Sequence, residues 1–315
     1  MSPPEAGFLK EGCMEKTYDV IVVGGGPAGL TAAIYALRNG KSVLVIEKSV
    51  FGGQIVNSPK VENIPGFESI SGDEFGDLML NQVMKQGGEV LFDEVTSVEK
   101  GDVLKVHCDM SEDRYGRTLI LATGTTHRTL GLEKEDSLIG RSIHFCAVCD
   151  GNFYKDKTVV MIGGGNSAFV ETSHLVDIVR KVIILQDMDH FTAEQKMQEQ
   201  ILNRDNVEAH VGTKILGYVL KDGKLTGVRY EENGEEKTAE CDGVFLAVGM
   251  IPDNDRFADL AQLDNRGYFI SDEYGLTENR NIFVAGDCRT KSLRQVATAC
   301  SDGANAAIQA CGYLG

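Results

Sequence analysis

The sequence lacks any apolar run long enough to cross a membrane. A transmembrane helix needs about 20 consecutive apolar residues, whereas the longest apolar run here, VIVVGGG at residues 20–26, is short and ends in glycines. The N-terminus also lacks the cationic start and following apolar stretch of a secretory signal. We therefore expect a cytoplasmic protein with no membrane association, in which residues 1–13 form a disordered tail.

Positive charge is scarce as well, because 31 Lys and Arg face 47 Asp and Glu, for a formal net charge of −16. A chain this acidic repels phosphate at long range, which argues against binding to nucleic acid or to an anionic membrane. With 42% hydrophobic and 25% charged residues, the remaining composition is that of an ordinary globular protein. A chain of 315 residues has room for two domains.

Closely spaced cysteines are also few, since only Cys146 and Cys149 among eight cysteines form a close pair. A chain with a core of this size needs no disulfide staples, so the count favours a reducing compartment. The sequence assigns no role to the single cysteines, and we expect most of them to be small apolar packing residues: Cys13, Cys108, Cys241, Cys288, Cys300 and Cys311.

Two stretches of the chain share one βαβ pattern. In the first, an apolar run at 19–23 predicts a buried parallel strand, residues 27–40 predict a helix, and residues 42–47 predict a second strand. Residues 157–187 repeat the order of strand, Gly-rich turn, helix and strand. The repeat predicts an α/β fold with two Rossmann-like, three-layer dinucleotide-binding domains.

The rest of the chain suggests that the second domain is inserted into the first. Apolar segments that end in turns predict further strands, and small and apolar residues at helical spacing predict a closing helix, at 118–124, 242–249, 281–287 and 294–314. The simplest parsing makes residues 127–250 a domain inserted into a host built from 14–126 and 251–315. The expected hinges lie near Thr125 and Gly249.

The first Gly-rich turn fits the pattern G-x-G-x-x-G with Gly24, Gly26 and Gly29. Gly24 allows a tight turn, Gly26 lets a pyrophosphate approach the backbone, and Gly29 lets the helix pack on the strand. Glu47 follows Gly24 by 23 residues, at the end of the second predicted strand, where it can accept hydrogen bonds from a ribose diol. Strand, helix and acid in this order predict a dinucleotide site rather than a bare turn.

The second Gly-rich turn lacks the positive charge that NADPH needs. The same offset of 23 residues, counted from Gly163, leads to Gln186. An NADP site carries Arg or Lys here for the 2′-phosphate, but no cation occurs before Lys196, and Asp187 and Asp189 occupy the stretch. Each like charge costs on the order of 1 kcal/mol, so NADPH is disfavoured. NADH could bind through Gln186 or Asp187, or the domain has kept its fold without binding nicotinamide.

The Cys146–Cys149 pair offers three interpretations. A structural zinc site needs four ligands, usually two pairs, and the chain has one pair with only His144 close to it, so we expect no metal site. Two thiols at this spacing can instead form a redox-active pair, because they close a small ring and one can be held as a thiolate. A flavin could reduce the pair, with Asp150 moving the proton. The third interpretation is two buried thiols beside a helix-capping Asp150.

Taken together, the motifs resemble the low-molecular-weight thioredoxin reductases, which are FAD-containing homodimers with two Rossmann-type domains. The resemblance extends from about Tyr18 to the C-terminus and depends on several motifs in order: GGGPAGLTAAIYALR, GGQI…VENIPGF, LATG, CAVCDGNFY, GGGNSA and VAGDCRTKSLRQVATACSDGANAA. It implies an enzyme that passes electrons from a donor through FAD to Cys146 and Cys149, and on to the disulfide of thioredoxin or a thioredoxin-like protein.

The resemblance also implies a role for individual residues. Cys149 would face the flavin, Cys146 would attack the thioredoxin disulfide, and Asp150 would donate the proton. Asp287 would hold the ribityl or pyrophosphate region of FAD, and residues 294–296 would lie beside the isoalloxazine. The implied FAD contacts are Gly24, Gly26, Pro27, Ala28, Glu47, Gly53, Gln54, Asn63, Ala122, Gly124, Asp287, Arg294, Gln295 and Val296.

The chain departs from the family pattern at the donor site. NADPH-dependent members carry His-Arg-Arg after the second strand of the inserted domain and a further Arg a few residues later, whereas this chain has Gln186, Asp187, Met188 and then Thr192. It resembles in this respect the ferredoxin-dependent flavin thioredoxin reductases, which use no nicotinamide. Yet the GGGNSA turn is retained, so reduced ferredoxin and NADH are both favoured over NADPH and the donor stays open.

Two other functions are compatible with these residues. A flavin-dependent dithiol oxidase would run electrons the other way, to oxygen, although CAVCDG and the retained second Gly-rich turn resemble the reductases more closely. A flavin-bearing sensor without catalytic activity would carry a vestigial second domain. Oxygen consumption with dithiols would identify the first, and turnover of thioredoxin would exclude the second.

Overall fold

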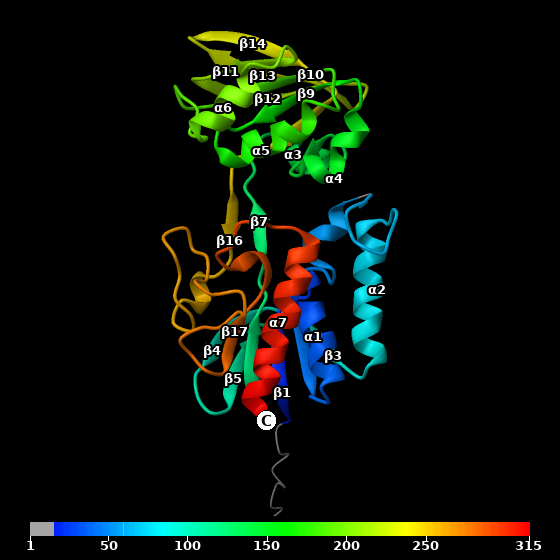
Figure 1. Ribbon diagram of the computed structural model, residues 1–315, viewed down its shortest axis with the longest axis vertical. Coiled ribbons are helices and arrows are strands. Elements are labelled where there is room, and N and C mark those ends of the chain that lie inside the picture. The colour runs from blue at the N-terminus through cyan, green and yellow to red at the C-terminus, as the bar shows by residue number, and fades with distance from the viewer. Residues whose placement is uncertain (1–15, 59) are drawn as a thin grey trace, which may run out of the picture.

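The computed structural model describes residues 16–58 and 60–315, so the tail predicted at residues 1–13 lies outside the described residues. Figure 1 shows two bodies joined by a narrow connection. One body contains both ends of the described chain, and the other contains its middle. None of the helices in the described part of the chain is both long and apolar enough to cross a membrane.

The body that contains the chain ends is a three-layer α/β unit. Its elements are β1 (Thr17–Val23), α1 (Pro27–Arg38), β2 (Val43–Glu47), η1 (Gly53–Asn57), α2 (Gly72–Lys85), β3 (Glu89–Phe92), β4 (Val95–Glu99), β5 (Leu104–Cys108), β6 (Arg114–Leu121), η3 (Asp255–Phe257), β17 (Ile282–Val284), η4 (Gly286–Cys288) and α7 (Val296–Leu314).

The central sheet of this body runs in the order β3-β2-β1-β6-β5-β4, with β17 also paired to β6. Strands β3, β2, β1, β6 and β17 run parallel to one another, whereas β5 pairs antiparallel with both β6 and β4. Because β2 is buried along its whole length and β1 along most of it, both faces of the sheet are covered. Helices α1 and α7 pack together so closely that a side chain at Gly303 would collide with the backbone of Ala28.

The other body repeats this plan on a smaller scale. Its elements are α3 (Glu135–Leu138), β8 (Ile143–His144), α4 (Ala147–Asp150), η2 (Gly151–Tyr154), β9 (Thr158–Ile162), α5 (Asn166–Leu175), β10 (Lys181–Leu185), α6 (Gln195–Leu202), β11 (Val207–His210), β12 (Thr213–Lys221), β13 (Lys224–Glu232), β14 (Glu235–Glu240) and β15 (Gly243–Leu246). A parallel sheet of order β11-β10-β9-β15-β8 packs against an antiparallel sheet of order β12-β13-β14.

Two short antiparallel strands join the bodies. Strand β7 (Thr125–His127) pairs with β16 (Met250–Pro252), with Thr125 opposite Pro252 and His127 opposite Met250. The chain therefore leaves the first body and returns to it through one two-stranded ribbon, visible between the bodies in Figure 1.

The two Gly-rich turns have the same backbone geometry. Gly24 and Gly163 both have left-handed backbone angles, with φ of 106° and 126°. A side chain at Gly24 would collide with the carbonyl of Ala122, and one at Gly163 would collide with the carbonyl of Ala247. In both cases the turn after the first strand lies against the end of the neighbouring strand, which only glycine permits.

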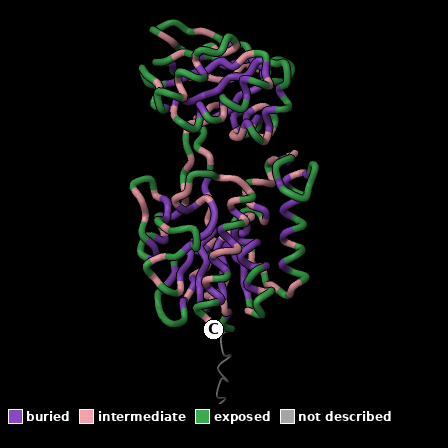
Figure 2. The backbone as a smooth tube through the Cα atoms, in the orientation of Figure 1, coloured by how far each residue is buried: buried purple, intermediate pink, exposed green. Residues whose placement is uncertain are grey.

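The predicted α/β fold with parallel sheets is confirmed. Figure 2 shows the parallel strands of both bodies buried and the connecting loops largely exposed. The strands and helices predicted from the two βαβ patterns appear as β1-α1-β2 and β9-α5-β10, within a few residues of their expected ends.

Candidate functional site

The close cysteine pair lies at the start of the one-turn helix α4. Cys146 is the N-cap residue, and the pair forms a disulfide with its Cα atoms 5.3 Å apart. The backbone N–H of Cys149 points at Cys146 Sγ over 3.2 Å. Both cysteines are half-buried, so the pair lies at the surface of the inserted body. An N–H directed at the sulfur stabilises negative charge there, which suits a thiolate nucleophile at Cys146.

Asp150 ends the same helical turn and is almost fully buried. Its Oδ2 lies 3.1 Å from Nδ1 of His144, whereas its Oδ1 has no hydrogen-bond partner. His144 is also buried, and its Nε2 lies 2.8 Å from the hydroxyl of Tyr154. Burial, together with the charge of Asp150, raises the pKa of Tyr154 above its ordinary value, so the phenol stays protonated.

A second acid, Glu171 of α5, lies beside the dithiol segment. Its carboxylate accepts a hydrogen bond from the backbone N–H of Ala147, and burial raises its pKa. Glu171 and Tyr154 were not predicted as site residues from the sequence, and His144 was considered there only as a zinc ligand. Glu171 and Tyr154 reach the site through folding rather than through motif spacing. The position of His144 within the same short stretch was the one available signal.

The predicted residues of the first Gly-rich motif meet at the carboxyl ends of β1, β2 and β6. Helix α1 begins at Pro27, and its N-cap Gly26 makes no side-chain capping bond, which leaves the helix N-terminus available to an anion. Glu47 ends β2 and accepts hydrogen bonds from the N–H groups of Gly25 (2.6 Å) and Ser49 (2.8 Å). This carboxylate therefore organises the turn itself, and it has further lone pairs for a ribose diol.

The other predicted contacts surround this turn. Gly53, with a φ of 65°, packs against the backbone of Gly26, and Gln54 donates a hydrogen bond to the carbonyl of Thr125 at 2.5 Å. Asn63 donates to the side chain of Gln295 at 3.0 Å, so the two segments meet here. The remaining members of the set lie at the start of α1, directly after β6, and in or beside η4 and the start of α7: Ala28, Ala122, Gly124, Asp287, Arg294 and Val296.

Asp287 lies in η4 and has a buried Oδ1 without a hydrogen-bond partner. Burial raises its pKa, although the nearby cations Lys291 and Arg294 oppose this shift. Arg294 donates to the backbone carbonyls of Asp287 (3.3 Å) and Arg289 (3.3 Å) and lies over the ring of Tyr268. Its guanidinium thus fixes the loop that carries Asp287.

These features fit the cofactor FAD. The uncapped N-terminus of α1 suits a pyrophosphate, and Gly26 and Gly53 leave room for close approach. Asp287 Oδ1, which has no hydrogen-bond partner and lies 3.8 Å from the Lys291 ammonium, offers an acceptor for a hydroxyl group. Among the described residues, Asp150 and Asp287 are the two residues with a buried side-chain oxygen that lacks a hydrogen-bond partner. Both were predicted as site residues from the sequence.

The second Gly-rich turn is covered by the segment that follows β10. The N–H groups of Thr192 (2.9 Å) and Ala193 (3.1 Å) donate to the carbonyl of Gly164, and Gln186 is buried with its side chain against the same glycine. Asp187 and Asp189 are exposed at the end of β10. The exposed surface beside this turn is therefore acidic, where an NADPH-binding domain is basic.

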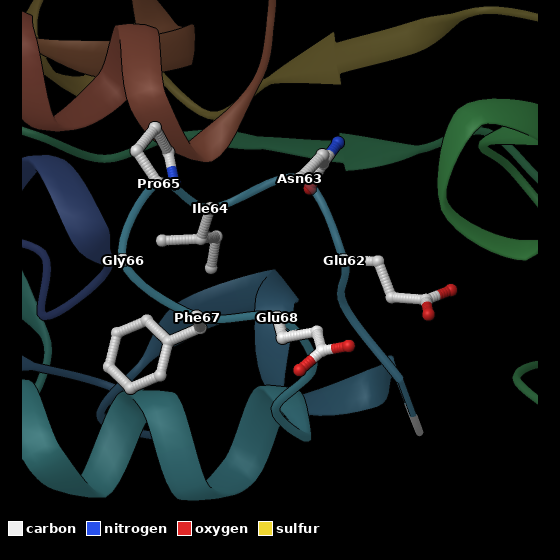
Figure 3. A pocket seen from close by; sticks show the side chains of 7 residues that line it. All are labelled: Glu62, Asn63, Ile64, Pro65, Gly66, Phe67 and Glu68. Atoms are coloured by element: carbon white, nitrogen blue, oxygen red, sulfur yellow. The ribbon is translucent and has the colours of Figure 1, made fainter.

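A surface pocket of about 460 Å³ opens beside the first site, in the loop between η1 and α2 (Figure 3). Residues 62–68 line it, and the carboxylates of Glu62 and Glu68 project to the same side of the loop. The ring of Phe67 packs edge-on against Phe75 of α2, with centroids 5.9 Å apart. This pocket adjoins Asn63 but contains none of the buried, unpaired groups of the site.

Two dinucleotide-type folds together with a closely spaced cysteine disulfide are typical of a flavin-type disulfide oxidoreductase. Residues 18–303 match the family model described as pyridine nucleotide-disulphide oxidoreductase, and the chain belongs to this family. Membership confirms the predicted class of enzyme and implies FAD as the cofactor. The resemblance noted from the motifs is confirmed at the level of the family.

The chain is similar to several thioredoxin reductases. It is 39% identical over 303 residues to that of Listeria monocytogenes, covering 95% of each chain. The thioredoxin reductase structure from Streptococcus pyogenes superposes with a TM-score of 0.87 at 35% identity, covering 95% of this chain and 98% of that one. The structure of Lactococcus lactis thioredoxin reductase in its FR conformation superposes with a TM-score of 0.67 at 33% identity, covering 94% of this chain and 99% of that one.

Proposed function

We propose that this protein is an FAD-dependent thioredoxin reductase whose Cys146–Cys149 pair reduces the disulfide of thioredoxin. The observation that carries the proposal is the surface disulfide at the start of α4, followed directly by a buried carboxyl with an unpaired oxygen. The full-length similarity to thioredoxin reductases supports the choice of partner. FAD, when bound, supplies the electron pair that converts the disulfide to the dithiol.

The chain's own residues suit the exchange with thioredoxin. Cys146, as a thiolate, attacks one sulfur of the thioredoxin disulfide, forms a mixed disulfide and releases the first thioredoxin thiolate. Cys149 then attacks Cys146 Sγ, which releases the second thiolate and restores the Cys146–Cys149 disulfide. The two protons of the enzyme dithiol end on the thioredoxin thiols, and Asp150 is the group beside Cys149 that can transfer one of them.

Replacing Cys149 by Ser tests this assignment. With Cys149→Ser, Cys146 attacks thioredoxin and no second enzyme thiol resolves the adduct. Alkylation of the released thioredoxin thiolate directly after mixing prevents it from reversing the exchange, so a mixed disulfide accumulates on Cys146. We expect this adduct by non-reducing electrophoresis and mass spectrometry, and we expect none with Cys146→Ser. Cys108→Ser, a change at a free cysteine on β5, is the matched control and should leave turnover intact. Absence of any adduct with Cys149→Ser would reject the proposal.

We also propose that NADPH is not the electron donor and that NADH or reduced ferredoxin takes its place. The support comes from the end of β10, where Gln186 is buried and Asp187 and Asp189 are exposed. A 2′-phosphate placed there would meet like charge, each contact costing on the order of 1 kcal/mol. The glycine turn is retained and the N-cap of α5, Gly165, makes no side-chain capping bond, which is why NADH stays a candidate.

Anaerobic bleaching of the FAD absorbance by each donor in turn tests this choice. We expect NADPH to bleach slowly or not at all, and either NADH or reduced ferredoxin to bleach rapidly. Rapid stoichiometric bleaching at micromolar NADPH would overturn the reading of residues 186–192. The result leaves the assignment of the dithiol untouched, because the Cys149→Ser adduct forms without regard to the donor.

We further propose that residues 127–250 turn as a unit on the host built from 14–126 and 251–315. The support is the β7–β16 ribbon, through which the chain crosses between the bodies. Gly249, with a φ of 114° and open space around it, precedes β16 and can absorb a change of backbone angle. Such a motion would present the dithiol alternately to the cofactor and to thioredoxin.

A further inference from the structure

A chain of buried side chains leads inward from the dithiol. Asp150, His144 and Tyr154 are 7%, 4% and 5% exposed. Asp150 Oδ2 lies 3.1 Å from His144 Nδ1, and His144 Nε2 lies 2.8 Å from the hydroxyl of Tyr154. Both ring nitrogens of a buried histidine are thus occupied, one by the carboxyl that follows Cys149.

The hydrogen bonds fix which nitrogen of His144 carries the proton when the ring is neutral. Tyr154 stays protonated, and its O–H can donate to Nε2, which leaves the N–H at Nδ1 to donate to Asp150. The rings are held in place by packing: Phe245 lies 5.5 Å from His144 and 5.7 Å from Tyr154. A side chain at Gly243 would collide with the Tyr154 ring, so glycine at the start of β15 makes room for it.

Asp150 is held on one side only. Oδ2 has the imidazole, and Oδ1 is buried without a hydrogen-bond partner. Buried polar atoms nearly always have a partner, and an acid that served only to hold the fold would have both oxygens engaged. The free oxygen belongs to the residue next to Cys149, so it is the atom available to exchange a proton with the dithiol.

The other charged groups around this chain come from several elements. Glu171 of α5 accepts from Ala147, and its pKa is raised by burial and by Asp150. Asp242 and Cys241, which precede β15, also raise the pKa of Tyr154 through electrostatic interaction. Lys157 lies over the Tyr154 ring, 5.5 Å from its centroid. The neighbourhood is predominantly acidic, with Lys157 as the cation described here.

We propose that His144, oriented by Tyr154, is a positioning residue for proton transfer at the dithiol, through its hydrogen bond to Asp150. As Cys149 attacks Cys146 Sγ, the thiol proton of Cys149 passes to Asp150, and from Asp150 to the departing thioredoxin thiolate. The Nδ1–H of His144 stabilises the carboxylate form of Asp150 and aims its free oxygen. The inference depends on the proposed thioredoxin reductase function, which supplies the reaction.

The test uses enzyme with bound FAD, reduced by dithiothreitol, freed of it anaerobically and mixed with thioredoxin disulfide in a single turnover between pH 5 and 9. With His144→Leu, Asp150 loses its N–H donor, so its carboxylate form is less stable. We expect the rate at pH 7 to fall about tenfold or more, and the acid limb of the pH profile to move to higher pH. His144→Asn keeps an N–H donor near Asp150 and should recover most of the rate.

Three further variants sharpen the result. Asp150→Asn combined with His144→Leu should be no slower than Asp150→Asn alone, because the histidine acts through the acid. Tyr154→Phe should move the profile in the same direction by less, and it decides the matter if His144→Leu does not fold. His210→Asn is the matched control. Both ring nitrogens of His210 are hydrogen-bonded, as those of His144 are, although both partners are carboxylates (Glu232, 2.9 Å, and Glu208, 2.7 Å), and His210 ends β11, on the far edge of the sheet from β8.

The outcomes separate this inference from the proposed function. If reduced wild-type enzyme transfers no electrons to thioredoxin, the proposed function is wrong. If wild type reacts and His144→Leu, folded with FAD bound, has an unchanged profile, the role of His144 is wrong while the function stands. The proposal that His144 acts through Asp150 would also be rejected by either of two results. One is a slower His144→Leu reaction with an unchanged pH profile, and the other is a double variant whose loss of rate is the product of the two single losses.

Discussion

At the scale of single residues, the acids with buried carboxylate oxygens in the described part of the chain divide into two groups. Asp93 has both oxygens engaged, with Oδ1 accepting from Met110 N–H (3.0 Å) and Oδ2 from Ser111 N–H (2.9 Å), and it holds a turn. Asp150 and Asp287 each keep one buried oxygen without a hydrogen-bond partner, although Lys291 Nζ lies 3.8 Å from that of Asp287. Leaving a buried acceptor without a hydrogen bond costs about 1–3 kcal/mol, and these are the two acids that we assign to a proton and to a cofactor.

Asp302 of α7 belongs with the fully paired acids, and its loss should weaken the cofactor site. It accepts hydrogen bonds from the buried cations Arg289 (2.7 and 2.9 Å) and Lys291 (2.9 Å) and from the N–H of Gly286 (3.0 Å), next to Asp287. Asp302→Asn leaves the buried side chains of Arg289 and Lys291 without their shared anionic partner, which should destabilise the fold by about 3–5 kcal/mol. Thermal unfolding, and FAD titration of the apoprotein, measure the two effects.

A matched control lies on the same arginine. Glu273 is 3.5 Å from Arg289 but 85% exposed, so Glu273→Gln should change stability by less than about 1 kcal/mol. Although burial opposes ionisation of Asp302, its bonds to Arg289 and Lys291 hold its pKa below the ordinary value. The stability it contributes is therefore present above pH 4 and is lost as the pH falls through that lowered pKa. Equal effects of the two variants would contradict the account.

At the scale of elements, the sequence predicted what local patterns determine. The strand–turn–helix–strand units appear as expected, because apolar runs and glycines specify them without reference to distant residues. The antiparallel sheet β12-β13-β14 was not predicted. Only β13 alternates between buried and exposed residues along much of its length, and the strands are rich in charge, as in EEKTAE of β14. Such strands are stabilised by pairing with each other, which one segment alone does not reveal.

The candidate site divides in the same way. The glycines, Glu47 and the cysteine pair lie within short motifs, so their spacing identified them. His144 and Tyr154 become partners because β8 pairs with β15 and places His144 opposite Phe245, beside which Tyr154 packs. Glu171 comes from α5, after a separate strand and turn. Contacts of this kind depend on sheet register and packing, and one sequence does not contain that information in a local pattern.

Strand β7 carries an ionisable group whose burial links folding to pH. The ring of His127 stacks on Phe145, next to Cys146, with centroids 4.1 Å apart, and burial lowers its pKa from 6.5 to about 4. A lowered histidine pKa contributes stability that is present above pH 6.5 and is lost as the pH falls toward 4. His127→Gln should remove this part of the acid sensitivity, worth roughly 1 kcal/mol because the ring is partly exposed.

Thermal unfolding measured at several values between pH 7 and 4 tests this expectation. Wild type should lose stability more steeply than His127→Gln across that interval. His190→Gln is the control, because His190 is exposed on the loop after β10 and should behave as wild type. If stability falls equally with pH in wild type and His127→Gln, then packing against Phe145 does not lower the pKa of His127, and the expectation is wrong.

At the scale of the whole molecule, the two bodies are joined by the ribbon and also contact each other beside it. One such contact joins the turn before β8 to η1, where a side chain at Gly140 would lie 3.2 Å from the carbonyl oxygen of Asn57. A small contact of this kind holds an arrangement weakly, in contrast to the continuous core inside each body. The ribbon and this contact together suit a molecule that changes the relative orientation of its domains.

A disulfide across this contact should hold the arrangement described and stop repeated turnover. Asn57→Cys combined with Gly140→Cys places two thiols on opposite bodies, and their oxidation should reduce steady-state thioredoxin reduction at least about tenfold, since one orientation cannot serve both cofactor and thioredoxin. Gly140 has a φ of 75°, so cysteine there introduces some strain. The single variants Asn57→Cys and Gly140→Cys control for that strain and should remain active. Undiminished turnover of the oxidised double variant, with the cross-link verified by mass spectrometry, would mean that catalysis proceeds without domain rotation.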